Sequence, residues 1–365
     1  MSHSHRPDYI LIAIFAVLII FGLIALSSAS VVIGYQKFDD SYYFLKHQIF
    51  YGLIPGLILF FLAYKTDYKK LKKAAIFLLA LSILLLVIIF IPGIGADFGN
   101  AKSWLNFKYF TFQPSEFVKL TLILYLAVLL SKERSGGVKQ GLLLPFLGIS
   151  GLCFCLVALQ PDLGTALIIV LTSFAVYFAA NTRNKEILFL ALFFIVGMFF
   201  LIKVIPSSYR SARFEAFLNP ALDPQGDGYQ INQSLLAIGS GGVFGRGLGL
   251  SIQKFQYLPE PAGDSIFAII CEELGFAFSF LLVTFFLVLT VRGYKIAKKC
   301  RDEFGKLIAF GITSMFIIQA FINIGGMVNL IPLTGVPLPF ISYGGSALVV
   351  SLASAGILLN ISKLS

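Results

Sequence analysis

The stretch "SIFAIICEELGFAFSFLLVTFFLVLTV", Ser265–Val291, decides the class of the fold. It carries only two charged residues, Glu272 and Glu273, and is longer than the roughly 20 apolar residues that a helix needs to cross a bilayer. The same length rule fits nine further segments, 10–32, 50–64, 74–91, 117–130, 142–159, 165–180, 187–205, 308–330 and 347–361. The sequence therefore predicts an all-α polytopic membrane protein of about ten transmembrane helices, organised as a single integral membrane domain over 1–365.

The composition supports this class. Of the 365 residues, 58% are hydrophobic and 13% are charged, and the mean hydropathy is +0.89. A soluble protein of this size cannot bury so much apolar surface, whereas a bilayer can cover it. The first segment follows Arg6 and precedes "SSAS", as in a secretory signal, but its apolar run is longer than a signal core. We therefore expect it to stay in place as a membrane helix.

Basic residues predict the orientation of the bundle. Most of the 28 Lys and Arg residues fall in the tails and in alternate loops, which places both termini on the cytoplasmic side of the cytoplasmic (inner) membrane. The net charge of +10 is then explained by topology and by attraction to anionic lipid, so no nucleic-acid partner is expected. Three segments face outward, 92–111, 206–264 and 332–346. The second, between helices 7 and 8, is too long for an idle connection.

Two stretches inside the large outer loop 206–264 have a recognisable pattern. "YQINQSLLAIGSGG" (229–242) predicts a short amphipathic helix that lies at the membrane interface and ends in glycines. The overlapping "GSGGVFGRGLG" (239–249) is glycine-rich. Such a loop can cradle a phosphate with its backbone N–H groups, but no strand precedes it, and a plain turn-rich loop fits equally well.

The residue types available limit the chemistry. His3 and His5 lie in the N-terminal tail and His47 lies near the second segment, so neither a histidine-based triad nor a zinc site can be assembled. The four cysteines fall in or beside apolar segments and are interpreted as small buried hydrophobes. Any proton transfer must therefore be carried by an acid or a lysine.

Acids within apolar segments require an explanation, because an ionisable group in a membrane helix is costly. Glu116 and Lys119, three residues apart, form either a buried neutralising pair or the charged wall of an outward-facing cavity. Glu272 and Glu273 point about 100° apart on a helix, so we expect them to meet different partners. One would bridge neighbouring helices and the other would line a cavity.

Asp264 and Glu260 lie just before the decisive stretch. Asp264 could simply cap the helix that begins at Ser265. Against that reading, acids and bases gather in the outer segments, which suggests a site for a charged substrate carried by a lipid. Candidate substrate-binding residues are Glu116, Lys119, Glu260, Arg210, Arg213, Arg246, Lys254, Lys102, Trp104, Gln233 and Ser234, and candidate structural or cavity residues are Glu272, Glu273, Pro337 and Pro339.

Five motifs together resemble one family. "QPSEFVKL", "QPDLGTALII", "GDGYQINQSLLAIGSGGVFGRGLG", "YLPEPAGDSIFAIICEELGF" and "GVPLPFISYGGS" are similar, in order and spacing, to the SEDS family of FtsW, RodA and SpoVE. The likeness covers nearly the whole chain, and "YYFLKHQ" favours the FtsW-like branch. Many members have His-Thr before the loop aspartate and Phe after it, whereas this chain has Ala262, Gly263 and Ser265, which leaves the partners of that aspartate open.

The resemblance implies a peptidoglycan glycosyltransferase that polymerises lipid II at the outer face of the membrane, for division or cell-shape synthesis. Asp264 takes the place of the essential aspartate and is the expected catalytic residue. The expected partners are lipid II, a class B penicillin-binding protein and other divisome or elongasome membrane proteins. No cofactor is evident, although a divalent cation such as Mg²⁺ could assist the diphosphate. A lipid II flippase and a non-catalytic scaffold for the transpeptidase are the alternatives.

Overall fold

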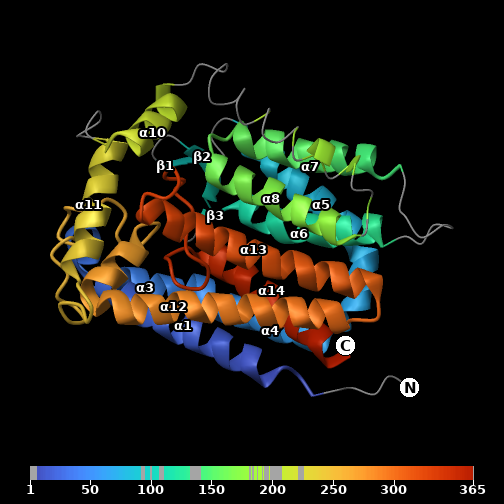
Figure 1. The fold of residues 1–365 in the computed structure, drawn as a ribbon, viewed down its shortest axis with the longest axis horizontal. Coiled ribbons are helices and arrows are strands. Elements are labelled where there is room, and N and C mark those ends of the chain that lie inside the picture. Colours follow the sequence, from blue (N-terminus) through green and yellow to red (C-terminus); the bar gives the residue numbers. More distant parts are fainter. Residues whose placement is uncertain are drawn as a thin grey trace.

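The computed structural model describes residues 6–91, 95–98, 101–106, 111–131, 141–180, 208–220 and 226–364, together with 182, 185–186, 188–190, 192 and 197. Long helices lie side by side in a bundle (Figure 1). The start of α1 (Tyr9–Ala29) and the end of α14 (Gly345–Leu364) lie at the same end of this bundle (Figure 1). We call this the terminal end. Short helices, loops and strands gather at the other end, which we call the site end.

The remaining described elements follow in chain order. They are α2 (Val31–Phe38), α3 (Tyr43–Gln48), a π-helical turn η1 (Ile49–Leu53), α4 (Ile54–Lys65), a 3₁₀ turn η2 (Tyr68–Lys70), α5 (Leu71–Ile88), β1 (Gly95–Phe98), β2 (Ala101–Asn106), β3 (Thr111–Phe112), α6 (Pro114–Leu130), α7 (Leu143–Ala158), α8 (Leu163–Ala179), α10 (Ser208–Leu218), α11 (Asp227–Ser240), α12 (Ile266–Lys299) and α13 (Glu303–Met327).

The predicted membrane class is confirmed. Among the described residues, six helical segments are long and apolar enough to cross a bilayer, and α7 and α8 are shorter apolar helices. The charged helix α6 occupies the fourth predicted segment. The seventh, 187–205, lies almost entirely outside the described residues. The first segment is the helix α1, as expected, and it packs against α12.

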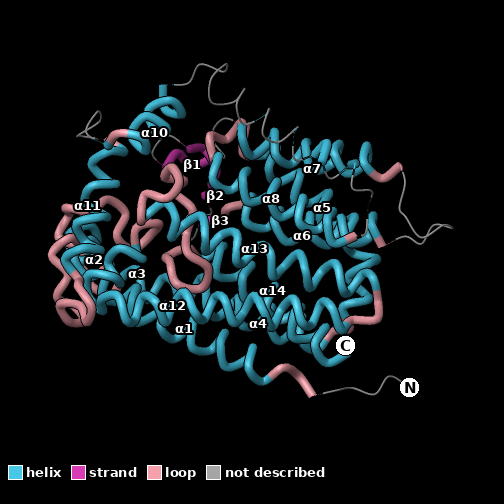
Figure 2. Tube along the Cα trace, in the orientation of Figure 1, coloured by secondary structure: helices cyan, strands magenta, loops and turns pink. Residues whose placement is uncertain are grey.

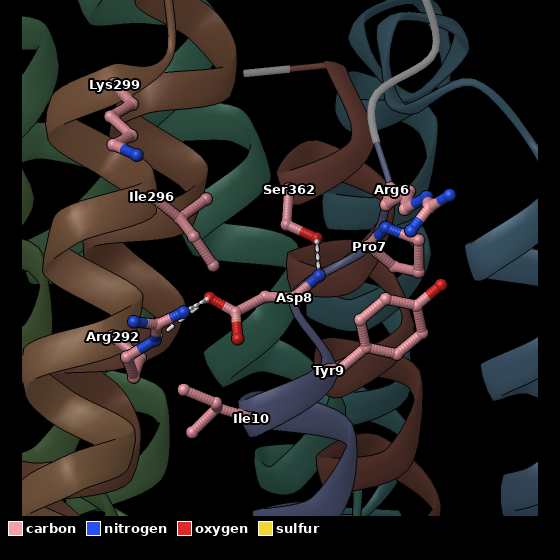
Figure 3. A pocket seen from close by; sticks show the side chains of 9 residues that line it. All are labelled: Arg6, Pro7, Asp8, Tyr9, Ile10, Arg292, Ile296, Lys299 and Ser362. Carbon is pink, nitrogen blue, oxygen red and sulfur yellow. Dashed lines mark hydrogen bonds and ion pairs between the residues drawn. The ribbon is translucent and has the colours of Figure 1, made fainter.

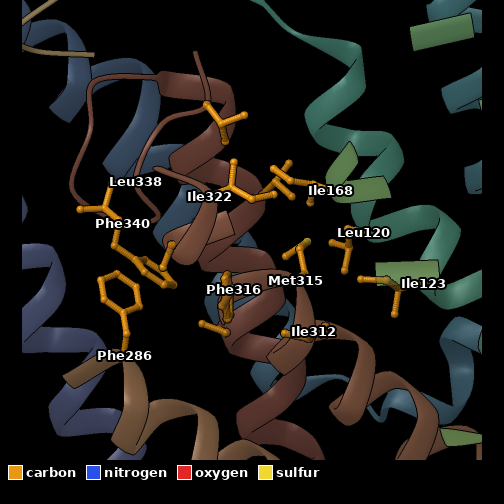
Figure 4. Close-up of a cluster of buried hydrophobic side chains, with 14 of the residues drawn as sticks. Leu120, Ile123, Ile168, Phe286, Ile312, Met315, Phe316, Ile322, Leu338 and Phe340 are labelled. Carbon is orange, nitrogen blue, oxygen red and sulfur yellow. The ribbon is translucent and has the colours of Figure 1, made fainter. Parts of the chain in front are cut away.

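The centre of the bundle is formed by α13 and α14. Their apolar windows are 72% and 78% buried, against 17–22% for the peripheral helices α3–α4 and η2–α5. Side chains from α6, α8, α12 and α13 meet the segment 332–344 in one apolar cluster (Figure 4). Phe340 packs between Phe15 and Phe316, with ring centroids 5.4 Å and 5.0 Å away. The segment 332–344, predicted to lie at the outer face, is thus folded back into the bundle.

Two local breaks in helices have sequence causes. Pro55 lacks a backbone N–H and its ring collides with the preceding turn, so the turn before it, η1, widens into π geometry inside the helix Tyr43–Lys65. Gly275 has φ +75°, a conformation that favours glycine, and it breaks α12 two to three turns after its start. A Cβ at Gly275 would lie 2.2 Å from the backbone nitrogen of Gly245, so a loop passes directly against this break.

The site end contains one predicted and two unpredicted elements. The amphipathic helix over 229–242 is confirmed as α11. The helix α10 and the antiparallel sheet β1-β2-β3 were not predicted (Figure 2). The residues between β1 and β2, Gly99 and Asn100, form a pair typical of a hairpin turn, and this was the signal available in the sequence.

Candidate functional site

Asp264 lies at the mouth of α12, in a tight turn that begins at Glu260. The Glu260 carbonyl accepts hydrogen bonds from Gly263 N at 3.0 Å and Ser265 N at 3.3 Å. Glu260 itself has φ +47°, a strained conformation of the kind that clusters at functional sites. The N-cap of α12 is Ser265, and no side chain caps this end. The alternative that Asp264 serves as the N-cap is therefore wrong.

The surroundings of the Asp264 carboxyl shift its acidity. Burial is the main cause and raises its pKa to about 6. The nearby Glu260 carboxylate adds to this rise in the pKa, while the Arg213 guanidinium and a hydrogen bond from Gln230 oppose it. Ser265 Oγ lies 3.5 Å from Asp264 Oδ1 and accepts from Gln230 Nε2 at 3.1 Å. The partners of the aspartate, left open by the sequence, are thus contributed by α10, α11 and the turn itself.

Two amides of α13 hold the backbone around this site. Asn323 Nδ2 donates to the Asp264 carbonyl at 2.7 Å and to the Val336 carbonyl at 2.8 Å. Gln319, one helical turn away, donates through Nε2 to the Pro337 carbonyl at 2.8 Å. Both side chains are buried. They fix Asp264 and the re-entrant segment 332–344 to the same central helix.

These amides were not among the residues predicted from the sequence, which were chosen for their charge. Their signal was a pair of polar residues four positions apart, hence on one face, within the apolar segment 308–330. Asp162 was not predicted either, and it caps α8 by accepting from Thr165 N at 3.0 Å. Its other carboxylate oxygen accepts from Gln113 Nε2 at 3.1 Å.

Glu116 and Lys119 form the expected pair on α6. Lys119 Nζ lies 2.8 Å from Glu116 Oε1, and the side chains of Lys119 and Glu116 are only 2% and 3% exposed. Lys119 also donates to Gln319 Oε1 at 2.7 Å. The pair is thus buried and does not form an open cavity wall. It connects to Asp264 through Gln319 and the rest of α13, and direct contact with a substrate stays a prediction.

Glu272 and Glu273 hold the glycine-rich loop. Glu272 accepts from Ser251 Oγ at 2.5 Å and from Ile252 N at 3.0 Å, while Glu273 accepts from Ser251 N at 3.3 Å. The expectation that these acids meet different partners holds for their charged partners, Arg246 and Lys254, but not for Ser251, which contacts both. The loop crosses both faces of the helix, and Ser251 offers its hydroxyl to one carboxylate and its backbone N–H to the other.

Lys254 belongs to the same cluster. Its Nζ lies 2.9 Å from Glu273 Oε1 and donates to the Gly249 carbonyl at 2.7 Å, and its side chain is 4% exposed. Ser28 of α1 donates to the Glu273 carboxylate at 2.7 Å. Arg246 forms a looser pair with Glu272, at 3.7 Å and 38% exposed. We call Ser28, Ser251, Lys254, Glu272 and Glu273 the loop clamp.

Backbone contacts next to the loop clamp distinguish between the two interpretations of the glycine-rich stretch 239–249, a phosphate cradle or a turn-rich loop. The Arg246 and Gly247 N–H groups donate to the carbonyls of Glu272 and Glu273, at 3.0 Å and 2.9 Å. A Cβ at Gly241 would lie 2.0 Å from the Cys271 carbonyl oxygen. These backbone groups and glycines serve close packing against α12, which favours the turn-rich loop over a phosphate cradle.

The remaining candidates are distributed over the site end. Arg213 of α10 is partly buried and donates to the Leu333 carbonyl at 3.3 Å. Ser234 is buried, with its hydroxyl 3.6 Å from Met327 Sδ. Trp104 and Gln233 are partly buried and Pro339 is buried, while the side chains of Lys102 and Arg210 lie outside the described residues. No group of three His, Cys, Asp or Glu side chains suited to a metal occurs in the described part of the chain.

Comparisons with known proteins identify relatives over the full length. The family profile described as "Cell cycle protein" (FTSW_RODA_SPOVE) matches residues 8–365. Stage V sporulation protein E of Bacillus subtilis is 44% identical over 98% of both chains. Proteins named probable peptidoglycan glycosyltransferase FtsW are similar too. The Geobacter sp. (strain M18) protein is 40% identical over 99% of this chain and 98% of its own, and the B. subtilis protein is 43% identical over 97% and 90%.

Solved structures share the fold. A chain from a study titled "Structural coordination of polymerization and crosslinking by a peptidoglycan synthase complex" superposes with a TM-score of 0.80, at 26% identity and over 98% of both chains. The rod shape determining protein RodA of Thermus thermophilus gives a TM-score of 0.71 at 27% identity, over 98% of this chain and 97% of that one.

Proposed function

This chain belongs to the FtsW/RodA/SpoVE family, and from that premise we propose that it is a peptidoglycan glycosyltransferase that polymerises lipid II, with Asp264 as its catalytic base. The observation that carries the assignment is the carboxyl at the mouth of α12, whose pKa burial raises to about 6. A general base works best when its pKa lies near the operating pH, because it is then both deprotonated and basic enough to accept a proton.

The chemistry requires such a base. The 4-hydroxyl of one lipid II attacks the anomeric carbon of a lipid-linked chain, forming a new C–O bond. The bond from that carbon to the diphosphate oxygen breaks, and the diphosphate leaves with the electron pair. The hydroxyl proton passes to the Asp264 carboxylate. A hydroxyl is a weak nucleophile until a base takes its proton, and such help contributes about 10²–10⁴-fold in rate.

The leaving diphosphate needs positive charge nearby. Arg213 is close enough to Asp264 to lower the pKa of that carboxyl, and it is the cation that we assign to the diphosphate. Arg210, on the same helix α10 as Arg213, and Lys102, on β2, stay candidates for the same role. A divalent ion would find the carboxylates of Asp264 and Glu260 beside the diphosphate oxygens.

A polymerisation assay tests the proposal. Purified protein is given labelled lipid II, with and without its transpeptidase partner, and the glycan products are sized on a gel. Polymer formation that depends on Asp264 supports the enzyme. Transport of lipid II across liposomes without polymer would favour the flippase. Normal glycan from a partner complex that lacks the Asp264 carboxylate would favour the scaffold.

The pKa of Asp264 predicts how activity depends on pH. Because a base must be deprotonated, kcat/KM should fall as pH drops through about 6, with the slope of a single proton. Replacing Arg213 by Gln removes a charge that lowers the pKa of Asp264, so the midpoint should move to higher pH. Arg246→Gln, which removes a cation paired to Glu272, is the matched control and should leave the midpoint in place. Equal midpoints in all three proteins would contradict the assigned base.

The orientation is proposed on charge distribution. The basic last turn of α12 lies at its terminal end, and Asp264 precedes its first turn. With the basic end inside, the site end is extracytoplasmic, where 206–264 was expected. In a background without Cys153, Cys155, Cys271 and Cys300, Gly226→Cys should react with an impermeant thiol reagent on intact cells, and Lys298→Cys only after lysis. The reverse labelling would overturn this orientation.

The partner and the branch follow from the relatives. A relative in a peptidoglycan synthase complex that coordinates polymerization and crosslinking supports a crosslinking partner, which we assign to a class B penicillin-binding protein. The identities to the sporulation protein and to FtsW of B. subtilis, 44% and 43%, differ little. We assign the chain to wall synthesis in division or sporulation and keep the FtsW-like branch as a prediction.

A further inference from the structure

A cavity of about 560 Å³ lies at the terminal end of the bundle, at the other end of α12 from Asp264. Figure 3 shows the residues that line it. The start of α1, the last turns of α12 and the end of α14 line it, and it is open on one side. Its walls carry three cations, Arg6, Arg292 and Lys299, and one carboxylate, Asp8. None of these residues has a part in the glycosyl transfer described above.

One cation is already neutralised. Arg292 Nε and Nη2 donate to Asp8 Oδ2 at 3.0 Å and 2.7 Å, and Asp8 Oδ1 caps α1 by accepting from Leu11 N at 3.1 Å. The Asp8 backbone N–H donates to Ser362 Oγ at 3.2 Å, which ties the floor of the cavity to α14. This part of the site is therefore fixed in position by its own hydrogen bonds.

The other two cations, Arg6 and Lys299, line the cavity without a counter-ion among the described residues. Their side chains form no hydrogen bond or ion pair with any part of the chain that the structure describes. The residues that line the cavity therefore carry two positive charges more than negative charges. An anion that contacts both Arg6 and Lys299 would supply the missing negative charge.

The rest of the wall indicates where that anion comes from. Ile10 and Ile296 give the cavity an apolar side, and Tyr9 and Ile10 are 62% and 48% exposed on the membrane helix α1. From Phe276, just after the break at Gly275, to Arg292 the helix α12 rises about 24 Å at 1.5 Å per residue, most of one hydrocarbon thickness. The cavity therefore lies near headgroup depth, beside the exposed apolar residues of α1.

We propose that this cavity binds the phosphate of an anionic phospholipid of the cytoplasmic leaflet, with Arg6 and Lys299 on the phosphate and the glycerol against Ile10 and Ile296. A soluble anion would use the two cations but leave the apolar side uncovered. The choice of leaflet rests on the proposed orientation, while binding itself does not depend on the proposed reaction.

Native mass spectrometry of the full chain, titrated with phosphatidylglycerol or phosphatidylcholine, tests the site. The variant Arg6→Gln/Lys299→Gln should bind phosphatidylglycerol about thirtyfold more weakly, since each basic residue near an anionic surface contributes about fivefold. The control Lys298→Gln/Arg301→Gln removes as much charge from the same end of α12 but from residues outside the cavity wall. It should keep most of the affinity.

The outcomes separate the sources of the phosphate. Preference for phosphatidylglycerol, lost only in the cavity variant, supports the site. Equal losses of phosphatidylglycerol affinity in both double variants would show that general surface charge causes the binding, and would overturn the proposed site. Displacement of the lipid by millimolar inorganic phosphate would assign the cavity to a soluble anion and would contradict the proposal that it binds a phospholipid. Labelling of Lys298→Cys on intact cells would overturn the cytoplasmic leaflet and, with it, the side of the membrane proposed for Asp264, whereas the lipid-binding results do not bear on Asp264.

Discussion

Asp264→Asn should lower the rate of glycan polymerisation by about 10²–10⁴-fold while the protein stays folded and bound to its partner. The amide has the size of the carboxyl but cannot take the hydroxyl proton. The hydrogen bond from Asn323 Nδ2 goes to the backbone carbonyl of this residue, so it survives the substitution. No helix cap is lost, because Ser265 is the N-cap of α12. Gel sizing of products from labelled lipid II measures the change.

The same substitution should not reduce stability. The pKa of Asp264 in the native state is about 6, above the ordinary 3.8, so the native state binds a proton that the unfolded state releases between these values. This carboxyl therefore contributes less stability as pH rises from about 4 to about 6. Asp264→Asn removes that loss, and its denaturation midpoint at pH 8 should equal or exceed the wild type. Inactivity together with a lowered midpoint would point to misfolding and leave the catalytic role unsupported.

Lys254→Met should destabilise the folded protein by about 3–5 kcal/mol, because it leaves the Glu273 carboxylate buried without its counter-ion. Ser28 Oγ and Ser251 N would still donate to Glu273, but neither carries charge. The denaturation midpoint in detergent at neutral pH measures the effect. The loop 241–254 should lose protection from proteases first, since the loop clamp is what fixes it to α12.

Two further variants isolate the buried charge as the cause. Arg246→Met removes a looser ion pair, 3.7 Å long with Arg246 38% exposed, to Glu272, which is 1% exposed but keeps its hydrogen bonds from Ser251 Oγ and Ile252 N, so it should cost less than Lys254→Met. Lys254→Met/Glu273→Gln removes both charges and keeps an acceptor for Ser28, and it should recover most of the lost stability. Equal destabilisation by the two methionine variants would contradict this account of the loop clamp.

The class of the fold could be predicted because it depends on local composition. A run such as Ser265–Val291 must be a membrane helix whatever its neighbours are, so the segments were found from hydrophobicity alone. The same reasoning could not find α10 or the small sheet β1-β2-β3. Both lie outside the apolar runs, and their hydrogen bonds depend on the local chain and its packing rather than on burial in lipid.

The site could be predicted only in part. The motifs pointed to Asp264, and spacing on one helix predicted the pair of Glu116 and Lys119. Which charge meets which across the bundle could not be predicted, because it depends on how distant segments pack. Lys254 was assigned to the substrate, yet it pairs with Glu273 inside the loop clamp. Asn323 was overlooked because an amide, unlike a charge, gives no strong signal in an apolar helix.

The contact between Ser28 and Glu273 also constrains the order of events during synthesis. These residues are 245 positions apart in the chain. At about 5–20 residues per second, the ribosome adds Glu273 roughly 12–50 s after Ser28. The first span is therefore made well before its hydrogen-bond acceptor, Glu273, exists. The loop clamp can form only once the eighth span, which carries Glu273, has been inserted. A chain that ends before residue 273 therefore cannot form the contact between Ser28 and Glu273.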